Sequence, residues 1–401
     1  MTRKLGFRYI WIDSLCIIQD DAADWQVEAA DMGRIYASAH LTIAATSSQS
    51  THDGFLRRDG SASELVTMPY HAHDDPDVKG EFYLDPRSRS QARDIVSSNW
   101  NRRGWTFQER LLSARVLHFC QERICFECRG CDVTEDNQAP HVSQQAIWLN
   151  PDPGRPKQWM SILEDEEPYR TYRIYYSMIQ RYTEREFTFQ TDLQPAILGL
   201  VKEMKRTIDD ECIWGIWRGG FHRGLLWCRH NLDSNPEKAD YLTRPSEKRA
   251  PSWSWISVNG SVSWNITRHK YNSQTQFGLK ILEDSMVQTS PPSALKVEAR
   301  LVKLSSCEER FSWDQTVQLY WDDQKVGHGW SDVREPQLIG RRDIWLLEVE
   351  IENKGMDGDE NLAALLVEES GDHTDSLSRV GFAVVVNTPF LQTRPRTIFL
   401  I

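Results

Sequence analysis

The first 45 residues constrain the fold of this chain more than any other stretch, because their hydrophobic period changes twice. Residues 7–12 form a nearly continuous aromatic and β-branched run, which predicts a strand buried on both faces. Acidic residues then precede a helical period over 22–37, and a second short apolar run follows at 41–45. This order predicts a βαβ unit whose two strands lie parallel, with a right-handed crossover.

The predicted helix carries a glutamate on its apolar face. At 100° per residue, Trp25, Met32 and Tyr36 fall on one stripe that should pack on the sheet. Glu28 falls inside this stripe, at about 300° when Trp25 is placed at 0°. An apolar surround disfavours the charged carboxylate and is typical of a functional site. The alternative is a carboxylate at the edge of the stripe that reaches water or pairs with an arginine.

The composition indicates the cellular compartment and excludes some classes of binding partner. A formal net charge of -11 and a pI near 5.5, without a basic block, argue against a nucleic-acid or anionic-membrane binder. No apolar run reaches the roughly 18 residues of a membrane helix, and no signal-type segment opens the chain. We therefore expect a cytoplasmic protein without a membrane or nucleic-acid partner, in which the eight cysteines are reduced.

Three further stretches set the predicted domain boundaries. Residues 102–119 predict a helix at 106–112 and a strand at 115–119, with a hairpin partner at 124–128. The first domain thus covers 1–136, and the proline-containing polar residues 137–158 predict a linker.

The rest of the chain is predicted to hold two regions. We expect a helical and Trp-rich region over 159–275, with helices at 168–184 and 195–207. Trp253 and Trp255 alternate as they would in a strand, and tight packing under the linker is the alternative. Residues 276–401 predict a β-rich region, because runs such as LKVEARLVKL, IWLLEVEI, LAALLVE and VGFAVVV are separated by glycine and charged turns.

Three ordered segments resemble a known family: WIDSLCIIQDD, DWQVEAADMGRIYASAHLTIAAT and RGWTFQERLLSARVLHF. They are similar to the successive motifs of the fungal heterokaryon incompatibility (HET) domain. Segments at 193–200, 215–217, 224–227 and 250–255 resemble the usual companions of that domain. The family's upstream strand with a Ser-Tyr-x-Trp-Gly pattern has no counterpart here, so we expect an N-terminally shortened HET domain.

The resemblance implies a fold and a chemistry. The HET domain resembles the TIR fold, a flavodoxin-like α/β architecture with a parallel sheet. TIR enzymes use a glutamate on a helix to cleave the nicotinamide glycosidic bond of NAD, which implies Glu28 as the catalytic residue. A carboxylate suits this reaction, because the ribosyl group passes through an oxocarbenium-like state. NAD would then be a substrate and not a cofactor.

Six further residues are candidates for substrate binding. Asp13 and Ser14 follow the first predicted strand, at the sheet edge where open α/β sheets bind ligands. Trp11 or Trp105 would stack on a ring of the ligand. Arg103, Trp105 and Glu109 either contact the ligand or hold the second half of the domain together by packing and ion pairing.

Three functions remain open at this point. The first is an NAD glycohydrolase in self/non-self recognition, programmed cell death and innate immunity. The second is a non-catalytic signalling module that self-associates or binds another incompatibility protein. The third is a degenerate relative without activity.

A cysteine cluster raises the question of a metal site. Cys120, Cys125, Cys128 and Cys131 have a spacing that could share zinc. A strand at 124–128 would point Cys125 and Cys128 to opposite faces. We therefore predict that the chain binds no stoichiometric zinc.

Overall fold

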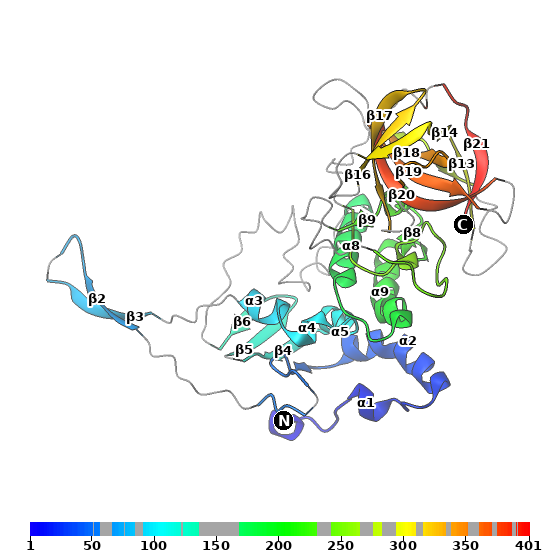
Figure 1. The fold of residues 1–401 in the computed structure, drawn as a ribbon. Helices are drawn as coiled ribbons and strands as arrows, with labels where there is room; N and C mark the ends of the chain where they lie inside the picture. Colours follow the sequence, from blue (N-terminus) through cyan, green and yellow to red (C-terminus); the bar gives the residue numbers. More distant parts are fainter. Residues whose placement is uncertain are drawn as a thin grey trace. The chain divides into compact units, whose positions relative to one another are not determined.

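The computed structural model describes residues 1–50, 52–56, 66–75, 77–84, 91–121, 123–135, 168–230, 242–264, 276–282, 294–309, 316–333, 338–351, 361–370, 375–386, 390 and 392–401. The chain divides into two units, Met1–Ile162 and Leu163–Ile401 (Figure 1). The predicted linker at 137–158 lies outside the described residues.

The first unit is built on a mixed four-stranded sheet in the order β1-β4-β5-β6. Its strands are β1 (Thr42–Ala44), β4 (Arg115–Phe119), β5 (Ile124–Cys128) and β6 (Asp132–Thr134). β1 and β4 are parallel, whereas β4, β5 and β6 form antiparallel pairs. The predicted strand at 115–119 and its hairpin partner at 124–128 are confirmed. The expected TIR- or flavodoxin-like parallel sheet is not confirmed.

The predicted strand at 7–12 is wrong. These residues lie between a 3-10 turn, η1 (Thr2–Leu5), and a short helix, α1 (Asp13–Cys16), and belong to none of the described sheets. Tyr9 is 81% exposed and Ile10 59%. An apolar run becomes a strand only when a neighbour supplies its backbone hydrogen bonds. Here β1 pairs with β4 instead, so the predicted βαβ unit does not form.

The predicted helix at 22–37 is confirmed as α2 (Ala22–Ser38). Asp21 caps it by accepting hydrogen bonds from the backbone N–H groups of Ala23 and Asp24. The helix packs against α5 (Thr106–Leu112), which occupies its predicted range. Met32 is buried, whereas Trp25 and Tyr36 are half-buried. The remaining described elements of this unit are β2 (Val66–His71), β3 (Lys79–Leu84), α3 (Gln91–Val96) and α4 (Asn99–Arg102).

The second unit begins with a helical, tryptophan-rich part. Both predicted helices are confirmed, at α8 and at η3 with α9. The elements are α8 (Pro168–Thr183), η2 (Gln190–Leu193), η3 (Pro195–Ile197), α9 (Leu198–Ile208), β7 (Cys212–Ile213), β8 (Ile216–Trp217), α10 (Phe221–Leu225), β9 (Cys228–Arg229), η5 (Trp255–Ser257) and β10 (Val262–Ser263).

Trp253 and Trp255 do not lie in a strand, and tight packing, the alternative for their alternation, accounts for them. Ser254 begins a 3-10 turn there by accepting a hydrogen bond from the backbone N–H of Ile256 at 3.0 Å. The indole N–H of Trp255 donates to the carbonyl of Gly215 at 2.9 Å. Both tryptophans are fully buried, so their alternation reflects packing and not strand geometry.

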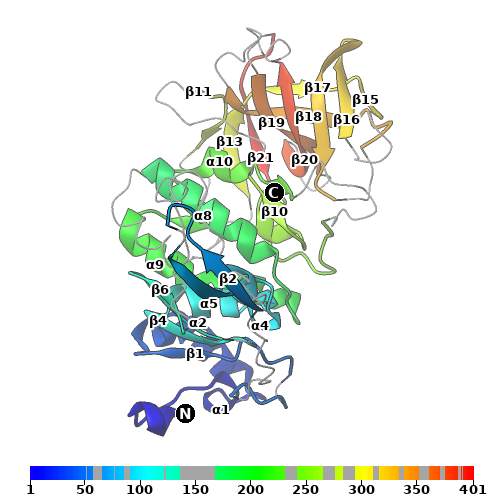
Figure 2. The same cartoon turned by 90° about the vertical axis from the view of Figure 1, so that its left-hand side faces the viewer.

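The predicted β-rich region is confirmed as a large sheet (Figure 2). β20 pairs with β17 along one part of its length and with β21 along another, so the sheet branches. Its strands are β11 (Gln276–Phe277), β12 (Lys280–Ile281), β13 (Leu295–Ala299), β14 (Leu301–Lys303), β15 (Ser306–Glu309), β16 (Thr316–Trp321), β17 (Gln324–Ser331), β18 (Ile344–Ile351), β19 (Asn361–Glu369), β20 (Ser376–Val386) and β21 (Arg396–Leu400).

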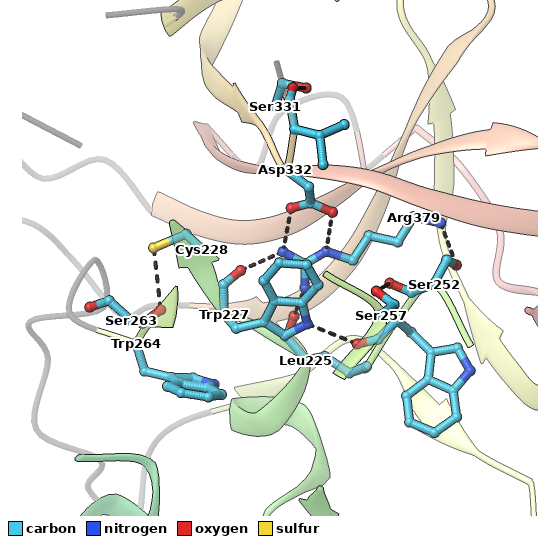
Figure 3. A network of polar contacts seen from close by, with 12 residues as sticks. Leu225, Trp227, Cys228, Ser252, Ser257, Ser263, Trp264, Ser331, Asp332 and Arg379 are labelled. Carbon is cyan, nitrogen blue, oxygen red and sulfur yellow. Dashed lines mark hydrogen bonds and ion pairs between the residues drawn. The ribbon is translucent and has the colours of Figure 1, made fainter. Parts of the chain in front are cut away.

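A buried ion pair within the β-rich region lies against the tryptophan-rich part (Figure 3). Arg379 on β20 donates to both carboxylate oxygens of Asp332, at 2.9 Å from Nε and 2.8 Å from Nη2. The same guanidinium donates to the carbonyls of Leu225 and Trp227 and lies 3.5 Å from the centre of the Trp227 ring. Burial lowers the pKa of Arg379, and the Asp332 carboxylate opposes this effect.

Candidate functional site

Two aromatic pairs connect α2 to the segments on either side of it. The rings of Trp25 and Trp105 meet edge to face, with centroids 6.1 Å apart. The rings of Trp11 and Tyr36 make a second edge-to-face pair at 5.7 Å. We call the surface where these residues meet the α2–α5 face. It joins the residues just before α1, the helix α2 and the start of α5.

Tyr36 is the polar centre of the α2–α5 face. Burial raises the pKa of its phenol well above the usual range, and the carboxylates of Glu109 and Asp13 raise this pKa further. A hydrogen bond to Glu109 acts in the same direction, whereas Arg103 lowers the pKa. The phenol therefore stays protonated and donates to Glu109. Three predicted site residues thus surround a tyrosine that the helical period marked only as a packing residue.

Glu28 lies on the same face of α2, one turn after Trp25. The helical wheel predicted a carboxylate enclosed by apolar side chains, whereas Glu28 is only half-buried. Asp31 raises the pKa of nearby Arg34 through a hydrogen bond and its charge, and Glu28 makes a smaller contribution. Glu28 is therefore close enough to the exposed Arg34 to act on it electrostatically.

Asp13 and Ser14 do not stand at the end of a strand, because residues 7–12 do not form one. They begin α1 instead, where Asp13 Oδ1 accepts a hydrogen bond from the backbone N–H of Ser14 at 2.8 Å. Both side chains are exposed. Asp13 acts on Tyr36 electrostatically, whereas no described contact links Ser14 to the α2–α5 face.

A second polar cluster lies beneath α5. Arg110 donates to both carboxylate oxygens of Glu127, at 2.9 and 3.0 Å, and His118 Nε2 lies 3.0 Å from Glu127 Oε2. Burial raises the pKa of Glu127, but the charges and hydrogen bonds of Arg110 and His118 outweigh it and lower the pKa to about 2. All three side chains are buried. The RGWTFQER motif hinted at this cluster only through Arg110, because its partners lie on β4 and β5.

This cluster anchors α5 to the sheet, so that Glu109 on the same helix can face α2. A pocket of about 190 Å³ opens beside it and includes Thr46, Ser48, Asp94 and Cys120 in its lining. None of the predicted site residues lines this pocket. Its volume is below the roughly 300–1,000 Å³ of small-molecule sites.

The four clustered cysteines separate into two pairs. Cys120 and Cys125 are buried beside Ile95. Cys128 is half-buried and Cys131 exposed, with their sulfur atoms 3.6 Å apart. Within the described part of the chain, no group of three or more His, Cys, Asp or Glu side chains could hold a metal ion.

The comparisons with known proteins concern the first unit. Residues 1–109 match the family model described as Heterokaryon incompatibility protein (HET). No curated protein and no solved structure matches the chain. Among the residues that the structure describes, no helix is long and apolar enough to cross a membrane. This chain therefore carries a heterokaryon incompatibility (HET) domain over residues 1–109, the range that holds every residue of the candidate site.

Proposed function

We propose that this chain acts in heterokaryon incompatibility by cleaving NAD to nicotinamide and ADP-ribose at the α2–α5 face. The observation that carries the proposal is that Glu109 and Asp13 meet at Tyr36 beside its aromatic pair with Trp11, inside the residues that match the HET family. Glu28 lies on the same helix as Tyr36, one turn after Trp25, which pairs with Trp105. Loss of NAD would be the route to programmed cell death after a non-self encounter, as in innate immunity.

The chemistry of the face suits the parts of a dinucleotide. The rings of Trp11 and Trp105 offer surfaces on which a nicotinamide or adenine ring stacks. Arg103 is an exposed cation of the type that binds a pyrophosphate. The protonated Tyr36 holds Glu109 by a hydrogen bond, which fixes one carboxylate in place without a counter-ion from the ligand.

The proposed reaction breaks the bond between the ribose carbon and the nicotinamide nitrogen. The electron pair of that bond leaves with nicotinamide, and water then attacks the ribose carbon and loses a proton. Positive charge develops on the ribosyl group before water attacks. The Glu28 carboxylate stabilises this charge and accepts hydrogen bonds from the ribose hydroxyls.

Cellular NAD tests the proposal. We expect NAD to fall when the 401-residue chain is expressed in a host cell, and to stay at the level of an empty vector when Glu28→Gln is expressed. Glu81→Gln makes the same change at an exposed position on β3 and should deplete NAD as the wild type does. Equal depletion by both variants would remove Glu28 from the reaction.

A second candidate function, non-catalytic self-association, rests on a separate observation. Apolar side chains of the N-terminal segment face solvent, namely Tyr9, Ile10, Ile12, Leu15 and Ile18. An exposed apolar patch of this kind marks an interaction surface. In analytical ultracentrifugation, the mass should rise with concentration for the wild type and remain that of one chain for Ile10→Asp with Leu15→Asp. A wild type that stays monomeric at all concentrations contradicts self-association.

A further inference from the structure

The turn between β5 and β6 carries two cysteines in a C-x-x-C spacing. Cys128 ends β5 and Cys131 immediately precedes β6, with Arg129 and Gly130 between them. Their sulfur atoms are 3.6 Å apart, and both cysteines are unbonded thiols. The turn is held by the antiparallel pairing of Glu127 with Asp132, so the two thiols stay neighbours as long as the hairpin is intact.

The backbone of the turn favours a thiolate at Cys128. The N–H of Cys131 donates to Cys128 Sγ at 3.3 Å, and the N–H of Gly130 makes a second hydrogen bond to the same sulfur. Burial raises the pKa of Cys128, but these hydrogen bonds outweigh it and lower the pKa below its usual value. The hydrogen bond with Cys128 raises the pKa of Cys131. The two thiols therefore differ in character, with Cys128 the better nucleophile.

We propose that Cys128 and Cys131 form a reversible dithiol–disulfide site, which is oxidised by low-molecular-weight disulfides. Cys128 thiolate attacks one sulfur of the small disulfide, the sulfur–sulfur bond breaks, and one small thiolate leaves. Cys131 then gives up its proton to solvent and attacks Cys128 Sγ, so that the second small thiolate leaves. Two electrons pass from the cysteine pair to the small disulfide, which is reduced to two thiols.

A disulfide fits this pair better than a metal does. A structural zinc site takes four ligands. The described residues offer no set of three or more ligating side chains, and the other two cysteines of the cluster are buried beside Ile95. A disulfide needs only the two sulfurs already in contact. Their separation must shrink from 3.6 Å to about 2.05 Å, a movement that side-chain rotation and a small shift of the turn supply.

The buried cysteines provide an internal control. Cys120 and Cys125 also lie next to each other, but they are buried, and the hydrogen bond with Cys120 together with burial raises the pKa of Cys125. Neither should react while the fold is intact. Cys16 is an exposed cysteine far along the chain from the hairpin and reports the reactivity of a thiol without a neighbouring cysteine in the sequence.

The test is an equilibrium titration of the full chain with glutathione and glutathione disulfide. After each equilibration the sample is quenched in acid, free thiols are alkylated, and the protein is digested with trypsin. Trypsin cleaves after Arg123 and Arg129, so a bond between Cys128 and Cys131 links the peptide 124–129 to the peptide that begins at Gly130. Fragmentation of the linked pair distinguishes Cys128 from Cys125, which lies in the same peptide. We expect this pair to form and to disappear reversibly, while Cys120 and Cys125 are alkylated only after unfolding.

Two single variants test the roles of the two sulfurs. Cys131→Ser should lose the linked peptides and accumulate a mixed disulfide at Cys128, because the second step has no attacking thiol. Cys128→Ser should lose the linked peptides and leave Cys131 no more reactive than Cys16. Elemental analysis of the reduced protein completes the test. The proposal is overturned if the linked peptides never form, if Cys128 bonds instead to Cys120 or Cys125, or if the reduced protein holds one zinc that either variant removes.

Discussion

Tyr36 joins the two helices of the candidate site, because its phenol binds Glu109 on α5 while its ring contacts Trp11. The hydrogen bond fixes the carboxylate, and burial together with the Glu109 and Asp13 charges raises the pKa of the phenol and keeps it protonated. A polar group placed in this way gives the face a defined geometry before any ligand arrives. A single substitution at Tyr36 can therefore separate the contribution of the hydroxyl group from that of the aromatic ring.

Replacing Tyr36 by phenylalanine removes the donor and keeps the ring. We expect Tyr36→Phe to lower the free energy of unfolding by about 1 kcal/mol, the usual net worth of a hydrogen bond. Urea denaturation followed by tryptophan fluorescence measures this. Tyr9→Phe makes the same change at a tyrosine that is 81% exposed and should have no effect. Equal free energies of unfolding for the two variants would show that the Tyr36 hydroxyl does not stabilise the fold.

The Glu127 cluster predicts how the first unit responds to acid. The native state lowers the pKa of Glu127 from 4.5 to about 2, so the unfolded chain binds the proton more readily. The stabilisation by the charged carboxylate is then complete above about pH 4.5 and is lost as the pH falls toward 2, on the order of 3 kcal/mol in all. We expect the amides of β4 and β5 to lose protection at pH 2.5. Their hydrogen exchange should then be faster than the intrinsic pH dependence of amide exchange predicts.

Glu127→Gln and Glu81→Gln complete that experiment. If Glu127→Gln folds, its β5 amides should already be weakly protected at pH 6 and change little between pH 6 and 2.5. Glu81→Gln should behave as the wild type, because Glu81 is exposed. Acid-insensitive protection of β5 in the wild type would contradict the assigned role of the ion pair.

At the scale of the elements, local sequence patterns predict the helices and the hairpin, but they do not predict which distant strands pair. The period and the acidic cap of α2, the helix α5 and the β4–β5 hairpin follow from residues close in sequence, so their prediction was correct. Residues 7–12 have the composition of a strand, but the parallel partner of β1 is β4, about 70 residues later. No local signal reveals that choice, because pairing depends on which strands meet in the folded chain.

The candidate site shows the same division. The sequence marks Glu28 and Glu109 as candidates because each lies at a distinctive position of a helix, one on an apolar stripe and one in a family motif. The helical period marks Tyr36 only as a packing residue, because its polar role depends on Glu109, which lies on another helix. No local pattern marks Glu127, because Arg110 and His118 reach it from other elements.

Among the contacts between elements, the Arg379–Asp332 pair gives the clearest prediction of a loss in stability. Asp332→Asn leaves a fully buried guanidinium without its carboxylate, so we expect a loss of about 3–5 kcal/mol in the stability of the second unit. Thermal unfolding measures this. Asp323→Asn is the matched control, because Asp323 is exposed in a turn with φ of 58°, a conformation that asparagine tolerates. Two variants that melt together would show that the buried pair does not stabilise the second unit.

For the whole molecule, the division into two units separates the candidate chemistry from most of the chain. Every residue of the α2–α5 face lies within Met1–Ile162, and the HET match ends at residue 109. The second unit has its own buried core and its own ion pair. NAD cleavage is therefore expected to depend on side chains of the first unit, and substitutions such as Asp332→Asn should affect it only through overall stability.

Nicotinamide release by the purified chain tests the proposed activity most directly. Wild type and the Glu28→Gln and Glu81→Gln variants are incubated with NAD, and nicotinamide and ADP-ribose are separated by chromatography, with thermal midpoints measured on the same samples. We predict equal amounts of both products from wild type and Glu81→Gln, and a loss of at least about 100-fold in Glu28→Gln at an unchanged thermal midpoint. Product release by Glu28→Gln at the wild-type level would contradict the catalytic role of Glu28. No release from folded wild type would contradict NAD cleavage by this chain.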